Sequence, residues 1–131
     1  AITQSSEQVN ALAVPVQQQS NAAQIQLLKL AKLSALGYTA ETDPAIQSYQ
    51  QQFDNGSADL RQQLATLATL TAGESRFTDI LSNIDNRYQQ YASAVDSMFN
   101  ARLQSNTLQH QVQTEFAALE QLIDKTLAQM A

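Results

Sequence analysis

The sequence predicts an all-α fold, arranged as an antiparallel up-down-up-down four-helix bundle with long helices. Ala, Leu and Gln dominate the 131 residues, with 21 Gln but only three Gly and two Pro. Apolar residues recur at steps of three and four, which is the spacing of one helix face, and no stretch alternates cleanly with period two. A chain of this length suits one core, so we expect a single domain over residues 1–131.

The first predicted helix covers roughly residues 3–36. Pro15 lies inside it, so we expect either a kink there or a helix that begins near residue 14. Gly37 fits the position just after the helix, where a left-handed backbone conformation costs glycine little. The apolar residues expected to face the core are Ile2, Val9, Val16, Ala23 and Leu30.

The second predicted helix covers residues 43–72, with Asp43 as its cap and Pro44 at its first helical position. Asn55-Gly56 is a strong turn signal in its middle, so a true break there is the alternative. The apolar stripe nevertheless keeps its phase through this dipeptide, so we expect the helix to continue at a cost of about 1 kcal/mol for the glycine. The residues of this stripe are Ile46, Phe53, Leu60 and Leu67.

After Gly73, which we expect to end the second helix, no Gly or Pro follows as far as Ala131. The apolar stripe there is interrupted once, between a first part that ends at Met98 and a second part that begins at Val112. Periodicity alone allows one helix of nearly 60 residues. The polar residues at the interrupted stripe positions are Arg102, Ser105 and Gln109.

Helix lengths favour a break in this interruption. The second helix has about 30 residues, and cutting the remainder gives two helices of similar length, at residues 74–101 and 105–131. Asn100, Ser105 and Asn106 are mild helix breakers, so we expect a turn between residues 99 and 107. Four matched helices with short loops form an up-down-up-down bundle.

Composition excludes several classes of function. A net charge of -5, with only seven Lys and Arg, argues against binding a nucleic-acid backbone. The chain has no Cys, so it offers no disulfide and no thiolate metal site. No apolar run approaches the roughly 18 residues of a membrane span. The opening AITQSSEQ suggests a mature chain or a fragment of a longer protein.

The residue pattern also argues against an enzyme, a metal site or a cofactor. The only His is His110, and Thr107 stands where a di-iron bundle would need Glu three residues earlier. No glycine-rich phosphate loop is present. Asp79 and Asp85 lie six residues apart, so a helix does not bring their carboxylates together. We expect function to come from binding.

The stretches VPVQQQSNAAQIQLLKLAKLSALGY and RYQQYASAVDSMF, with the overall length, resemble the periplasmic sensor domain of bacterial methyl-accepting chemotaxis proteins. The resemblance implies an extracytoplasmic ligand-sensing domain between two membrane spans of an inner-membrane receptor. It further implies a homodimer packed largely through the first helix, and signalling by a small axial shift of the last helix. Both spans must meet one membrane, which requires an even number of long helices. Sensor histidine kinases carry similar bundles.

The first helix carries an independent sign of a second interface. Ile25, Leu28 and Leu36 fall on the side away from the core stripe, so they predict a weak parallel homodimer. Lys29 and Lys32 lie on the same outer side. They could hold an anionic small-molecule ligand, such as an organic acid or amino acid, where sensors of the aspartate type use basic residues. A solvated pair of lysines is the alternative.

Tyr49 and Tyr91 could line the same region, although both lie on core stripes, which favours core packing. Two functions therefore stay open: a ligand-sensing receptor domain, and a structural or interaction bundle such as an adaptor or surface-coating protein. Membrane spans encoded on both sides of this segment would select the first function.

Overall fold

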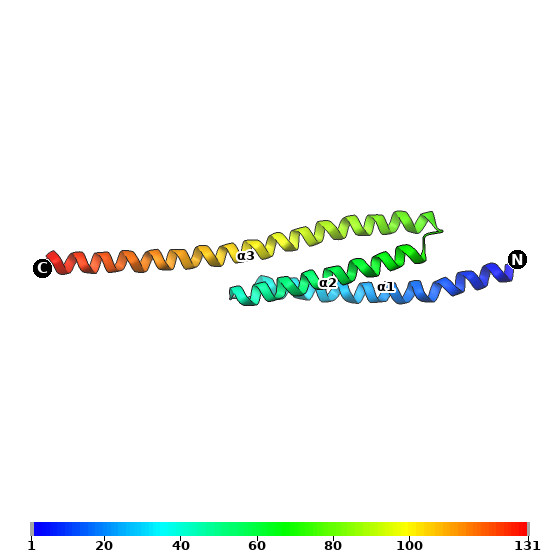
Figure 1. The fold of residues 1–131 in the computed structure, drawn as a ribbon, viewed down its shortest axis with the longest axis horizontal. Coiled ribbons are helices and arrows are strands. Elements are labelled where there is room, and N and C mark those ends of the chain that lie inside the picture. Colours follow the sequence, from blue (N-terminus) through cyan, green and yellow to red (C-terminus); the bar gives the residue numbers. More distant parts are fainter. Residues whose placement is uncertain (1, 131) are drawn as a thin grey trace.

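The computed structural model describes the backbone of residues 2–130 and the side chains of residues 13–130, and within these residues the fold is all-helical. Three helices follow one another: α1 (Ile2–Thr39), α2 (Asp43–Leu70) and α3 (Ser75–Met130). Short turns join them, so α1 and α2 form an antiparallel hairpin and α3 runs back along it (Figure 1). The first residues of α1 and the last residues of α3 therefore lie at opposite ends of a long rod.

The core of the hairpin confirms the predicted stripe and the predicted continuity of α2. The four stripe residues of α2 are all buried, and α2 runs unbroken through Asn55-Gly56. Gly56 allows α1 to come close, because the amide of Gln26 donates a 3.0 Å hydrogen bond to its carbonyl oxygen. A Cβ at this position would lie 2.8 Å from a methyl group of Leu30, the fully buried stripe residue of α1.

The start of α1 agrees with the predicted helix from about residue 3, whereas its end lies further along the chain than predicted. The helix does not begin near residue 14, because it continues across Pro15 from Ile2. Gly37 is a helical residue with no positive φ, and α1 continues to Thr39. The missing side chain of Gly37 instead leaves room for the ring of the buried Phe99, because a Cβ at this position would lie 2.7 Å from Cζ of that ring.

The other stripe residues of α1 agree with the prediction as far as they are described. Val16 and Ala23 are half-buried, whereas the side chains of Ile2 and Val9 lie outside the described residues. At the start of α2 the cap is Thr42, whose hydroxyl accepts a 3.3 Å hydrogen bond from the backbone N–H of Ala45. The prediction that Asp43 caps this helix is therefore wrong by one residue.

The predicted turn between residues 99 and 107 is wrong, because α3 is one helix of 56 residues rather than two helices over 74–101 and 105–131. No Gly or Pro interrupts it, and Asn or Ser in a helix costs only a fraction of a kcal/mol. One polar residue of the interrupted stripe, Arg102, binds the end of the hairpin together with Asn106, whereas Ser105 and Gln109 are exposed. Nη2 of Arg102 donates a 2.6 Å hydrogen bond to the carbonyl of Ala40, and the amide of Asn106 donates a 3.0 Å bond to Asp43.

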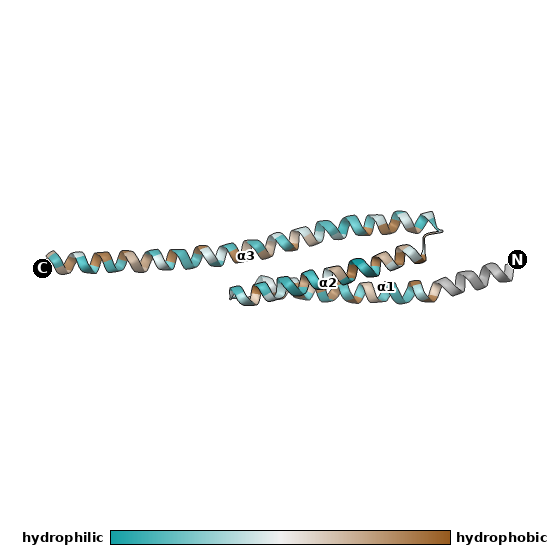
Figure 2. Ribbon diagram, in the orientation of Figure 1, coloured by the Kyte–Doolittle hydropathy of each residue, from teal (hydrophilic) through white to brown (hydrophobic). Residues whose placement is uncertain are grey.

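Beyond these bonds α3 leaves the hairpin. We call residues 107–130 the α3 tail; it extends past the α1–α2 turn with no helix beside it (Figure 1). Every side chain of the tail is exposed. Hydrophobic residues nevertheless recur along its whole length (Figure 2). Residues 2–130 thus form a three-helix rod with a projecting helix, and the predicted four-helix arrangement is not seen among them.

Candidate functional site

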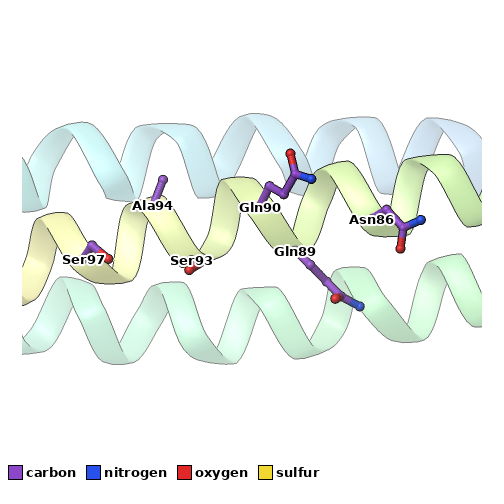
Figure 3. Close-up of a pocket in the computed structure, with 6 residues that line it drawn as sticks. All are labelled: Asn86, Gln89, Gln90, Ser93, Ala94 and Ser97. Carbon is purple, nitrogen blue, oxygen red and sulfur yellow. The ribbon is translucent and has the colours of Figure 1, made fainter.

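The hollows on the helical rod offer hydrogen bonds but little reactive chemistry. One hollow runs along α3 and is lined by amide and hydroxyl side chains, among them Gln90 and Ser93 (Figure 3). No ionisable group lines it. A second hollow lies between α2 and α3, where Arg61 and Asp85 stand among mainly small or apolar residues. Thr78 and Ser82 add two hydroxyl groups to the lining of the second hollow.

The titratable groups of the described residues are distributed along the three helices. His110 lies exposed on the α3 tail, and residues 13–130 hold no group of three potential metal ligands. Burial, and secondly the charge of Asp96, raise the pKa of Asp54 above its usual value. Burial also raises the pKa of Tyr91, with a smaller contribution from Tyr88. The shift of Tyr91 reflects its packing against the core, whereas Asp54 is an exposed residue of α2 that is only slightly desolvated.

The structure separates the predicted ligand residues into two environments. Lys29 and Lys32 are exposed on α1. Tyr49 and Tyr91 are partly buried against the core, where the ring centroids of Tyr91 and Phe53 lie 6.2 Å apart. Neither hollow is lined by any of these four residues. The role of these four residues in ligand binding stays a prediction. Only the two lysines lie on an exposed surface, where a ligand could reach them.

The predicted dimer residues form an uncovered surface on α1. Ile25, Leu28 and Leu36 are 55%, 66% and 36% exposed. The exposed Val14 adds to this surface. Residues 13–39 contain two lysines and no acidic residue, so the surface is apolar and positive. We call it the α1 outer face, and its residues are Val14, Ile25, Leu28, Lys29, Lys32 and Leu36.

A second uncovered apolar surface lies on the α3 tail and is the larger of the two. Phe116 is 64% exposed and Met130 is 78% exposed, although side chains of this kind are usually buried. Acidic residues accompany this stripe: the tail carries three acidic residues and one lysine. We call this surface the tail face, and its apolar residues are Leu108, Val112, Phe116, Leu119, Ile123 and Met130.

Sequence reasoning found the stripe that forms the tail face but placed it in the core of the same chain. The spacing of three and four residues identifies an apolar helix face, and it does not identify the helix that covers that face. The structure leaves the face open, which makes it a candidate binding site.

Comparison with protein-family models, curated proteins and solved structures finds no match to this chain. Within the described residues, none of the three helices combines the length and the apolar character needed to cross a membrane.

Proposed function

We propose that this chain is a non-enzymatic helical interaction domain that binds another helix through the tail face. The observation that carries the proposal is a helix of 24 residues, 107–130, on which every side chain is exposed while six large apolar residues share one side. This is the pattern by which a helix docks against a helical partner. It corresponds to the adaptor or structural class of function.

Helix energetics support this proposal. Most of the stability of a helix in a protein comes from packing an amphipathic face, and isolated helices shorter than about 12–15 residues are marginal in water. The tail makes no such contact within the chain, yet its sequence has no Gly or Pro to end the helix. A partner helix would provide the missing packing.

The magnitude is sufficient for a specific complex. Full burial of a large apolar side chain stabilises by roughly 1.5–3 kcal/mol, so six of them give about 9 kcal/mol at the lower end of that range. Association costs about 4–15 kcal/mol in lost freedom. One tail face therefore gives weak binding, whereas a complex that buries two tail faces is clearly favourable.

Size-exclusion chromatography with light-scattering detection, at a series of protein concentrations, tests this proposal. Phe116→Glu places a charge in the middle of the tail face and should abolish association. Gln121→Glu is the matched control, because it adds the same charge about 140° further round the helix at 3.6 residues per turn. If both variants associate like the parent chain, the tail face is not a binding surface.

A second candidate function is the ligand-sensing domain of a chemoreceptor, and the α1 outer face favours it. Lys29 and Lys32 stand exposed beside Leu28 without an acidic residue nearby in the helix. In a parallel homodimer through Ile25, Leu28 and Leu36, these lysines would meet at the boundary between subunits. A small carboxylate bound there would relieve their repulsion.

This candidate makes a further demand on the parent protein. The two ends of the rod lie far apart, so a receptor built on it needs another helical pass to bring both ends to one membrane. The genomic sequence on either side of this segment is a direct test. Flanking membrane spans and a cytoplasmic signalling region support ligand sensing. Titration calorimetry with small carboxylates should then lose its signal in the Lys29→Ala, Lys32→Ala double variant.

A further inference from the structure

We infer that the tail face binds the α1 outer face of a second copy of this chain, in a reciprocal two-fold dimer. The inference rests on the first proposed function and names its partner. In this dimer the tail face of each copy packs against the α1 outer face of the other copy, so both uncovered apolar surfaces become buried. Four observations support this occupant: charge, direction, register and length.

Charge favours pairing the two different surfaces over pairing either with itself. The tail carries Glu115, Glu120 and Asp124 against one lysine, whereas α1 carries two lysines and no acid over residues 13–39. Two α1 outer faces together would crowd four lysines. Two tails together would crowd six carboxylates. The mixed pairing places opposite charges side by side.

Direction follows from the phase of α3. Ala94 is exposed and lies on the edge of α3 that is nearer α1 in the view of Figure 3. Val112 and Met130 follow it by 18 and 36 residues, which are whole numbers of turns at 3.6 residues per turn. The tail face therefore continues the exposed edge of α3 that borders α1, and it lies beyond the end of that helix rather than on the buried side of α3 marked by Val95 and Phe99. Any helix bound there must stop where α1 stops, at the turn held by Arg102.

A second copy turned end for end meets this condition. The α1 helices of the two copies would then face each other end to end, across the residues that follow Thr39. In this orientation the tail of one copy runs antiparallel to α1 of its partner. The same contact occurs twice, as a two-fold axis requires.

The register then matches apolar residues to apolar residues. The tail begins at residue 107, beside the turn, and its first residues therefore face the last turns of the partner's α1. Each surface covers about 24 residues, or about 36 Å at 1.5 Å per residue. Glu115 falls level with the partner's Lys29. The apolar pairs are Leu108 with the partner's Leu36, Phe116 with the partner's Leu28, Leu119 with the partner's Ile25 and Met130 with the partner's Val14.

The dimer completes a bundle that one chain leaves unfinished. At each end, α1, α2 and the first half of α3 are joined by the partner's tail. The directions of these four helices alternate up, down, up and down, which is the arrangement that the sequence predicts. The fourth helix comes from the second copy, so the polar interruption of the α3 stripe marks the boundary between the two halves of the dimer.

Disulfide cross-linking between two different cysteine variants tests the pairing. The chain has no native cysteine, so every disulfide must form between introduced residues. Ile25→Cys and Leu119→Cys are made in separate chains, mixed and mildly oxidised. We expect a covalent dimer that contains one chain of each kind and little dimer in either variant alone. The circular dichroism of each variant should match the parent chain, which shows that the helices persist.

The other cross-linking outcomes separate this inference from the proposed function. A dimer of Leu119→Cys with itself means that tail binds tail, which overturns the inference and keeps the tail face as a binding surface. A dimer of Ile25→Cys with itself indicates the parallel dimer of the sensor candidate and also overturns it. No cross-link, with a chain that stays monomeric in light scattering, refutes the inference and leaves a helix of another protein as the partner under the proposed function.

Charge reversal gives a second test. Glu115→Lys should weaken dimerisation by about 1.4- to fivefold for each ion pair, the range for exposed pairs. Adding Lys29→Glu to the same chain should restore the dissociation constant. If the double variant is weaker than Glu115→Lys alone, these residues do not meet across the interface and the register is wrong.

Discussion

Replacement of Gly37 by alanine should destabilise the fold, although alanine is the better helix former. Gly37 lies inside α1 with an ordinary helical backbone, so its backbone gives no reason to require glycine. The reason is the ring of Phe99, which is 0% exposed and lies within 3.0 Å of the position of an added Cβ at three of its atoms. The ring cannot move out into solvent to make room.

The net effect is the balance of two opposing contributions. Alanine in a helix interior gains about 1 kcal/mol over glycine. Forcing an extra carbon into a packed core costs about 1–3 kcal/mol, and displacing a buried Phe approaches the 3–5 kcal/mol cost of its removal. We therefore expect Gly37→Ala to lower the free energy of unfolding by about 1–2 kcal/mol. For a domain of this size, that lowers Tm by about 3–10 °C.

Thermal unfolding followed by circular dichroism, at one protein concentration, measures this shift. Gly73→Ala is the matched control, because an added Cβ there meets no atom within 4 Å and its φ is not positive. It should leave Tm unchanged or raise it slightly. Gly56→Ala should fall between the two. A Tm of Gly37→Ala at or above that of the parent chain would refute the close contact between α1 and α3.

Three further results are expected. Burial and the charge of Asp96 raise the pKa of Asp54 in the folded chain, so the free energy of unfolding falls as pH rises through that pKa. Asp54→Asn should therefore raise Tm at pH 7. Well below pH 3.8 the aspartate is protonated in both the folded and the unfolded chain, so the gain should disappear. Arg102→Ala should lower the free energy of unfolding by about 1–2 kcal/mol, and lower Tm with it, because it removes a charged hydrogen-bond donor from the carbonyl of Ala40. Arg102→Lys keeps a charged donor and should recover part of the loss. Dimerisation measured by sedimentation should weaken as salt is added, since the paired faces carry opposite charges.

Periodicity predicted the hairpin well. The stripe from Ile46 to Leu67 kept one phase through Asn55-Gly56, and this phase outweighed a strong local turn signal because it reflects burial against α1. The reason for the glycine could not be read from α2. It depends on Gln26 and Leu30, which approach from another helix.

Packing across helices also explains the errors in detail. The predicted α3 stripe steps through Met98, yet its neighbour Phe99 is the fully buried residue, because Gly37 opens space for the ring. Thr42 and Asp43 are both good capping residues, and only the backbone geometry shows that Thr42 caps α2. Neighbouring residues of similar character cannot be separated by pattern alone.

The single long α3 shows why the candidate site was missed. Length matching assumed that every apolar face is covered within one chain, so a polar interruption suggested a turn. Arg102 and Asn106 are polar for another reason, because they bind the end of the hairpin. The stripe beyond them was correctly identified as apolar. A sequence pattern carries no information on whether the covering helix belongs to the same molecule.

Amide hydrogen exchange over a series of protein concentrations tests the central claim most directly, namely that the tail face binds a second copy. Backbone amides of residues 107–130 should exchange fast in dilute protein, where the tail packs against nothing, and slowly in concentrated protein. Amides of α2 around Phe53 and Leu60 serve as the internal reference, because these residues are buried at every concentration. Equal exchange of the tail amides across the series, with α2 protected throughout, would contradict the claim.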